Sequence, residues 1–128
     1  MTTTAPNGGA IDLPRTDPDA LARLERFGGR KLLHEMIALY LENAPGRLAA
    51  AADGVTAGDP VAAENALHSL KSSSAQLGAL RLSRLCEEGE AIARGGRLEG
   101  IAEVLDAGTK ELAVVEGWLA GVRAERPA

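Results

Sequence analysis

Two Asp-Pro pairs and a series of glycines divide this sequence into segments of helical length. Asp17-Pro18 and Asp59-Pro60 each combine an N-cap residue with a proline that suits the first helical turn. Glycine favours the ends of helices, because it adopts left-handed backbone without a steric penalty. The glycines that stand where such segments should end are Gly28-Gly29, Gly58, Gly78 and Gly95-Gly96.

Apolar residues repeat at helical spacing between these start and stop signals. Aromatic residues, which favour strands, make up only 2% of the chain. The pattern predicts six helices, over residues 17–27, 30–43, 45–57, 60–77, 82–94 and 98–122. Short connections make neighbouring helices antiparallel. We therefore predict an all-α fold: an antiparallel up-and-down four-helix bundle from the last four segments, with two additional N-terminal helices packed near one end.

The same pattern predicts the domain organisation. Residues 17–123 are expected to form one helical domain, since 128 residues suffice for a single core. The polar, proline- and glycine-bearing residues 1–16 are expected to be a disordered tail, and residues 124–128 a short C-terminal tail.

Charge and hydropathy exclude several classes of function. The net charge is −4 and no basic run is present, which disfavours nucleic-acid binding. No apolar stretch approaches the roughly 20 residues that cross a bilayer, and the N-terminus lacks the features of a secretory signal, so we expect a cytoplasmic protein without membrane insertion. Cys86, the one cysteine, lies on the apolar stripe of its segment. With two histidines and one cysteine, no metal site is expected.

One histidine faces away from the apolar stripe of its predicted helix. At about 100° per residue, Lys71, Ser72 and Ala75 fall within about 60° of His68. The apolar face, with Leu70 and Leu77, lies on the opposite side of the same helix. A solvent-facing imidazole beside a cation and small side chains suits chemistry with a large partner. The other histidine, His34, has no second ligand at helical spacing and is expected to be structural.

This segment resembles the histidine-containing phosphotransfer (HPt) domain of two-component phosphorelays. The family pattern H-x-L-K-G-S, followed by G-A, appears here as His68, Leu70, Lys71, Ser72 and Ser73, then Gly78 and Ala79. Ser72 stands where the family usually has glycine. Further matches are the FGG at residues 27–29 with the LLHEMIALYLENAP that follows it, the GDP at residues 58–60 and LSRLCEEGEAIARGG at residues 82–96, so the resemblance covers about residues 17–120.

The resemblance implies a phosphorelay carrier with the same bundle. A receiver domain's phospho-aspartate would donate to His68, which would pass the group to another receiver. Lys71 would offset the phosphoryl charge, and Ser72 would donate a hydrogen bond to the phosphoryl group. The implied partners are response-regulator receiver domains and a hybrid sensor histidine kinase. No nucleotide-binding loop or carboxylate cluster is present, so we expect a monomeric, non-enzymatic carrier without a cofactor, with Mg²⁺ on the receiver.

The receiver is expected to dock on the side chains around His68, which are Glu64, Ala75, Gln76 and Ala79. Glu64 lies one turn before the histidine and either accepts a hydrogen bond from the ring or is an ordinary solvated glutamate. The alternative function is a non-transferring helical module that binds and inhibits a receiver or kinase. An inert structural bundle would instead carry large apolar side chains on the His68 stripe.

Overall fold

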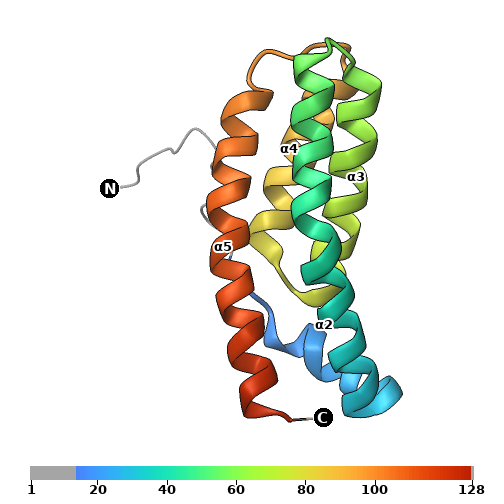
Figure 1. The fold of residues 1–128 in the computed structure, drawn as a ribbon, viewed down its shortest axis with the longest axis vertical. Helices are drawn as coiled ribbons and strands as arrows, with labels where there is room; N and C mark the ends of the chain where they lie inside the picture. The colour runs from blue at the N-terminus through green and yellow to red at the C-terminus, as the bar shows by residue number, and fades with distance from the viewer. Residues whose placement is uncertain (1–13, 128) are drawn as a thin grey trace.

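The computed structural model describes residues 14–127, and every regular element in that range is a helix. The four helices are α2 (Pro18–Thr56), α3 (Pro60–Leu77), α4 (Leu80–Arg94) and α5 (Ile101–Glu125). Successive helices run in opposite directions and form one elongated bundle (Figure 1). The predicted all-α, antiparallel four-helix bundle is thereby confirmed. Within the described range, no helix combines the length and the hydropathy that crossing a bilayer requires.

The prediction of two additional N-terminal helices is wrong, because α2 takes up all three of the segments expected before Gly58. Gly29 interrupts α2 with φ 77° and ψ −178°, so the chain bends there and continues as a helix. Pro45 lies inside α2 instead of opening a helix. Residues on both sides of the proline are buried with one continuous helical phase, namely Tyr40, Ala44, Leu48 and Ala51. Packing of this stripe outweighs the one backbone hydrogen bond that proline removes.

The predicted start and stop signals of α3 are confirmed. The Asp59 side chain accepts a hydrogen bond from the Ala62 amide at 3.1 Å, as an N-cap should. Gly78 ends the helix in the left-handed region, with φ 86°. The Asp17 side chain caps α2 in the same way, through the Asp19 amide. These caps set the residues at which α3 begins and ends and at which α2 begins.

Residues 15–17 lie across the turn between α3 and α4. The Arg15 carbonyl accepts hydrogen bonds from the amides of Leu80 and Arg81, and the Asp17 amide donates to the Gly78 carbonyl at 2.8 Å. A Cβ on Gly78 would come within 2.4 Å of the Asp17 carbonyl oxygen. The last residues of the expected tail therefore pack on the bundle, while residues 1–13 lie outside the described range. At the other end, α5 includes residues 124 and 125 of the expected C-terminal tail.

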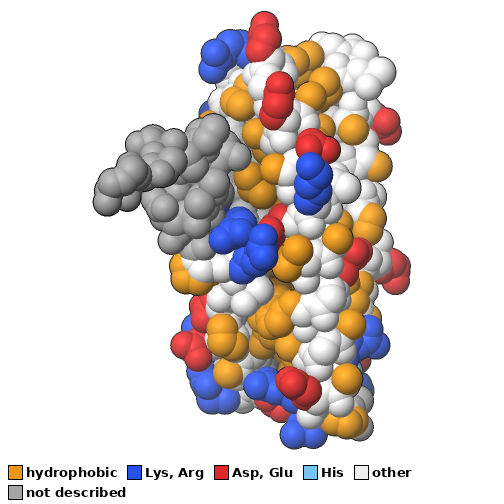
Figure 2. Space-filling view, turned by 90° about the vertical axis from the view of Figure 1, so that its left-hand side faces the viewer, with side chains coloured by type: hydrophobic (Ala, Val, Ile, Leu, Met, Phe, Trp, Pro, Cys, Tyr) orange, Lys and Arg blue, Asp and Glu red, His pale blue; other side chains and the backbone are white. Residues whose placement is uncertain are grey.

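Helix α3 packs against α2 and α4, and α5 packs against the same two helices from the diagonal position. The core-facing side of α3 is buried through Leu67, Leu70, Ser74 and Leu77. Buried Ser74 exchanges a 2.8 Å hydrogen bond with the Tyr40 hydroxyl, so the polar atom is satisfied inside the core. The side of the bundle on which α5 lies carries interspersed acidic, basic and apolar side chains (Figure 2). The outward side of α3 stays open to solvent.

Candidate functional site

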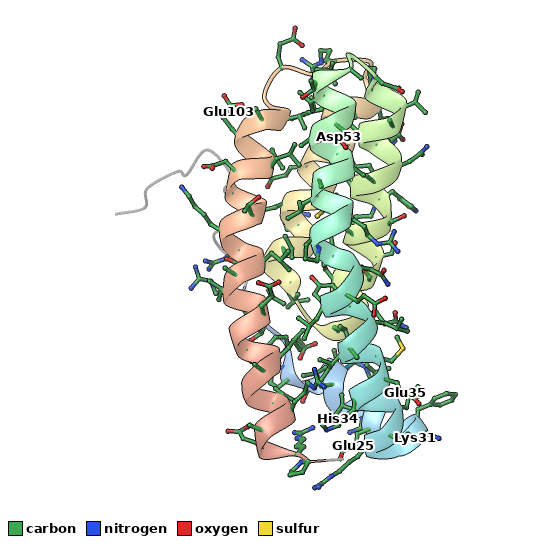
Figure 3. All side chains as sticks on the ribbon, viewed as in Figure 1. Glu25, Lys31, His34, Glu35, Asp53 and Glu103 are labelled. Atoms are coloured by element: carbon green, nitrogen blue, oxygen red, sulfur yellow. The ribbon has the colours of Figure 1, made fainter. Side chains whose placement is uncertain are left out.

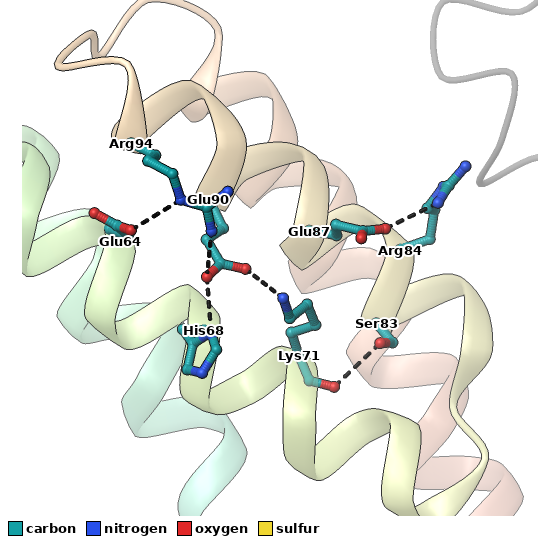
Figure 4. A network of polar contacts seen from close by, with 8 residues as sticks. All are labelled: Glu64, His68, Lys71, Ser83, Arg84, Glu87, Glu90 and Arg94. Atoms are coloured by element: carbon teal, nitrogen blue, oxygen red, sulfur yellow. Dashed lines mark hydrogen bonds and ion pairs between the residues drawn. The ribbon is translucent and has the colours of Figure 1, made fainter.

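His68 lies in the middle of α3 and points outward, with 60% of its side chain exposed, as the helical phase predicts. Lys71 follows one turn later, half-buried against α4. Across the α3–α4 interface, Glu90 projects from α4 toward both side chains (Figure 4). The Glu90 side chain is only 3% exposed, so its carboxylate is removed from bulk water. The site therefore places an exposed imidazole over a buried negative charge.

Glu90 binds three partners. Its Oε2 accepts a hydrogen bond from Nδ1 of His68 at 2.7 Å and lies 2.9 Å from an Nη of Arg94. Its Oε1 lies 2.7 Å from Nζ of Lys71, an ion pair whose angles fall outside those of an aligned hydrogen bond. Burying a carboxylate is costly unless cations and hydrogen bonds compensate it. The ring, the lysine and the arginine together provide that compensation.

The ionisation of Glu90 follows from these contacts. Burial alone would raise the pKa of the Glu90 carboxyl, but the contacts with Lys71 and His68 outweigh it and lower the pKa overall. Glu90 is therefore an anion at neutral pH. Because its pKa is lower in the folded state, its stabilising contribution is present above the ordinary carboxyl pKa and is lost as the pH falls through the lowered value.

The carboxylate determines which ring nitrogen of His68 is free. An ionised carboxylate only accepts hydrogen bonds, so Nδ1 must carry the hydrogen. The other nitrogen, Nε2, then holds its lone pair on the side of the ring that points away from Glu90 (Figure 4). A neutral imidazole whose Nε2 lone pair is free is a competent nucleophile.

Close packing between α3 and α4 brings Glu90 to the ring. Gly89 precedes the glutamate, and a Cβ there would lie 2.8 Å from a methyl carbon of Leu67. Leu67 is the neighbour of His68 and is buried in the core. Glycine at position 89 thus lets the two helices approach where the histidine and the carboxylate meet.

Glu64 is not the partner of the ring. Its Oε2 accepts a hydrogen bond from Nε of Arg94 at 3.3 Å, and the same guanidinium contacts Glu90. Arg94 therefore links α3 to α4 above the histidine. Neither Glu90 nor Arg94 was among the candidates from the sequence, because helical periodicity does not reveal which residues of two helices face each other. A glutamate beside the apolar stripe of its segment was the only available signal.

The exposed neighbours of His68 include Ser72, Ala75 and Gln76, which lie on the open side of α3. Ala79 is fully buried, so its expected place at the rim of a docking surface is wrong. The reason is local: α3 ends at Leu77, and the left-handed Gly78 turns the chain so that Ala79 enters the core.

The remaining candidate side chains lie apart from this site. His34 is at the opposite end of the bundle, near Glu25, and its Nε2 contacts the Arg126 carbonyl (Figure 3). Cys86 is buried, and burial is the main reason that the pKa of its thiol rises to about 12, so it is an unreactive core residue. Across residues 14–127, no three His, Cys, Asp or Glu side chains are grouped in a way that would hold a metal ion.

The two histidines are predicted to be opposite tautomers. His68 donates Nδ1–H to a carboxylate, and His34 donates Nε2–H to a carbonyl. Long-range ¹H–¹⁵N NMR near pH 8 measures this directly, with each ring as the control for the other. A neutral His68 ring that carries its hydrogen on Nε2 would contradict the geometry.

Comparison with known proteins agrees with this arrangement. The Hpt domain family matches residues 35–125, more than half of the chain. The structure is similar to the crystal structure of histidine-containing phosphotransfer protein B from Pseudomonas aeruginosa PAO1, with 25% sequence identity and a TM-score of 0.83 over 89% of this chain and 98% of that one. It is also similar to the HPT domain of a sensor hybrid histidine kinase from Shewanella, with 20% identity and a TM-score of 0.71 over 89% and 97% of the two chains. No curated protein sequence matches. The chain belongs to the Hpt domain family and is a histidine phosphotransfer protein of phosphorelays.

Proposed function

We propose that His68 is the phosphoryl acceptor, and that it carries the group between the aspartates of two receiver domains. The observation that supports this is the 60% exposed ring of His68, whose Nδ1 is hydrogen-bonded to buried Glu90. The lone pair attacks the phosphorus of a receiver's phospho-aspartate, and the aspartate oxygen leaves. The reverse attack by the next receiver's carboxylate regenerates the ring.

Lys71 supplies the counter-charge in this proposal. A phosphoryl group brings about two negative charges, and the Lys71 ammonium lies one helical turn from the ring. Its contact with Glu90 holds the lysine near the histidine while the group is absent. Ser72, exposed on the next turn, is the proposed hydroxyl donor to a phosphoryl oxygen.

Magnesium, in this proposal, belongs to the partner. Mg²⁺ prefers carboxylate and phosphate oxygens, whereas the groups nearest the ring include two cations, Lys71 and Arg94. The carboxylate of Glu90 is already occupied by them and by the ring. The receiver would therefore provide the metal and the acidic pocket, and this chain the nucleophile. Hpt domains are phosphocarriers and not catalysts.

The receiver would dock over the open face of α3. Ser72 and Ala75 are small and exposed, so the surface beside the histidine is low enough for an aspartate pocket to approach. Gln76 also lines a groove between α3 and α2, which includes the 53% exposed Leu39. Glu64 lies on the α4 side of the ring.

The non-transferring alternative gains no support, because simple binding does not need a carboxylate and a lysine beside one histidine. The monomeric state and the cytoplasmic location remain predictions from the sequence.

Replacing the acceptor tests the proposed function. His68→Gln should abolish acid-labile, alkali-stable phosphoryl labelling by a phosphorylated receiver, since the nucleophilic nitrogen is gone. His34→Gln, at the far end of the bundle, should label like the wild type. Helicity measured by circular dichroism should be unchanged in His68→Gln. Full labelling of His68→Gln, or loss of labelling only in His34→Gln, would show that the acceptor is wrongly assigned.

Steric variants test the docking face. Ser72→Arg or Ala75→Trp should lose most receiver-dependent transfer, because a long side chain blocks the approach to His68. The melting temperature should stay the same, since both positions are exposed. Ala102→Trp is the control, on an exposed position of the diagonal helix α5. Normal transfer by both α3 variants would mean that the receiver approaches from another side.

A further inference from the structure

The ring of His68 needs only a hydrogen-bond acceptor at Nδ1, yet the structure provides a full negative charge. A neutral amide oxygen could accept the same hydrogen bond without the cost of burying an anion. Glu90 is 3% exposed, and its carboxylate lies 2.7 Å from the ring nitrogen. The charge of Glu90 is therefore expected to act on a state of the ring that is itself charged.

Phosphorylation of His68 creates that state, and this step rests on the proposed function. Once Nε2 is bonded to phosphorus, a ring that still carries hydrogen on Nδ1 has a formal positive charge. The adjacent Glu90 carboxylate is the natural counter-ion for this cation, because the two groups already share a hydrogen bond. Without the hydrogen, the phosphorylated ring would place a lone pair against a buried carboxylate, which is repulsive.

We propose that the charge of Glu90 keeps Nδ1 of the phosphorylated His68 ring protonated, so that the ring always leaves as neutral imidazole. When the next nucleophile forms its P–O bond, the Nε2–P bond breaks and its electron pair returns to Nε2. The hydrogen on Nδ1 stays in place, and Glu90 neither gains nor loses a proton. If Nδ1 were deprotonated, the leaving group would be an imidazolate anion, which is a much stronger base and a much poorer leaving group.

Retention of this hydrogen means that no proton has to move when the phosphoryl group arrives at a neutral His68 ring or departs from it. The ring begins with hydrogen on Nδ1, keeps it while phosphorylated and retains it after transfer. Loss of the phosphoryl group from the ring then becomes insensitive to pH around neutrality. Glu90 acts in this way as a positioning residue, through the ring and without touching the phosphoryl group.

The other charged groups around the ring do not replace this role. On α3, Lys71 and Glu64 flank the histidine, and on α4, Arg94 pairs with both glutamates. Among the described residues, no hydrogen bond or ion pair joins the ring to α2. Glu90 is therefore the one described carboxylate in contact with the Nδ1 hydrogen.

Glu90→Gln removes the charge and keeps an acceptor oxygen, which makes it the decisive variant. Glu87→Gln is the matched control: it makes the same change one turn earlier on α4, where the carboxylate pairs with Arg84. Both variants and the wild type are phosphorylated chemically with phosphoramidate, a small-molecule phosphoryl donor. After removal of the donor, loss of the phosphoryl group is followed by ³¹P NMR between pH 5.5 and 7.5.

The expected result is a change in pH profile. An imidazole without a neighbouring carboxylate is half-protonated near pH 6.5, so its protonated fraction falls about tenfold from pH 5.5 to 7.5. The decay rate of Glu90→Gln, divided by that of the wild type, should fall by about that factor over this range. The ratio for Glu87→Gln should stay constant. Ionisation of the phosphoryl group itself is common to all three proteins and cancels in the ratio.

A constant ratio for Glu90→Gln would overturn the role of its charge. If Glu90→Gln does not fold or label, ¹H–¹⁵N NMR of the phosphorylated wild type decides: the Nδ1 hydrogen should persist at pH 8, and its loss between pH 6 and 8 would overturn the proposal. A wild type that takes up no acid-labile label would contradict the proposed function itself, which separates the two failures.

Discussion

The buried carboxylate of Glu90 is the group on which the arrangement of the site depends. It lies at the interface of α3 and α4 and is stable there only because His68, Lys71 and Arg94 surround it. The same contacts hold the imidazole in one orientation and one tautomer. They also keep a lysine close to the nucleophile before any phosphoryl group arrives. One ion-pair network therefore links packing of the bundle to the chemistry of an exposed ring.

That network requires α3 and α4 to be held in one register. Asp59 caps the start of α3 and Gly78 ends the helix. Residues 15–17 form backbone hydrogen bonds with the turn that follows. Gly89 then lets α4 approach Leu67 closely enough for Glu90 to reach the ring. The caps set the ends of α3, and the close contact at Gly89 brings Glu90 next to His68. The exposed residues Ser72, Ala75 and Gln76 on the outward side of α3 are accessible to a partner.

The sequence predicted well whatever lies within a single helix. The outward direction of His68 and the ends of α3 follow from periodicity and capping, which are local. The number of helices was wrong because the signal at Pro45 was weaker than the continuous packing of α2 on both sides of it, whereas Gly29 does bend the chain within α2. Glu90 was missed because its role arises from contact between two helices. Ala79 was misplaced because helical periodicity applies only within α3, and the left-handed Gly78 changes the direction of the chain just before Ala79.

Buried Glu90 leaves Nε2 of His68 as the reacting atom of the proposed carrier. The most direct measurement is the position of the phosphoryl group on the ring, read by ¹⁵N and ³¹P NMR of the ¹⁵N-histidine-labelled protein after transfer from a phosphorylated receiver. We expect phosphorus on Nε2 of His68, with the hydrogen retained on Nδ1. Phosphorus on Nδ1 would mean that the contact with Glu90 breaks during transfer, and it would contradict the assignment of Nε2 as the reacting atom.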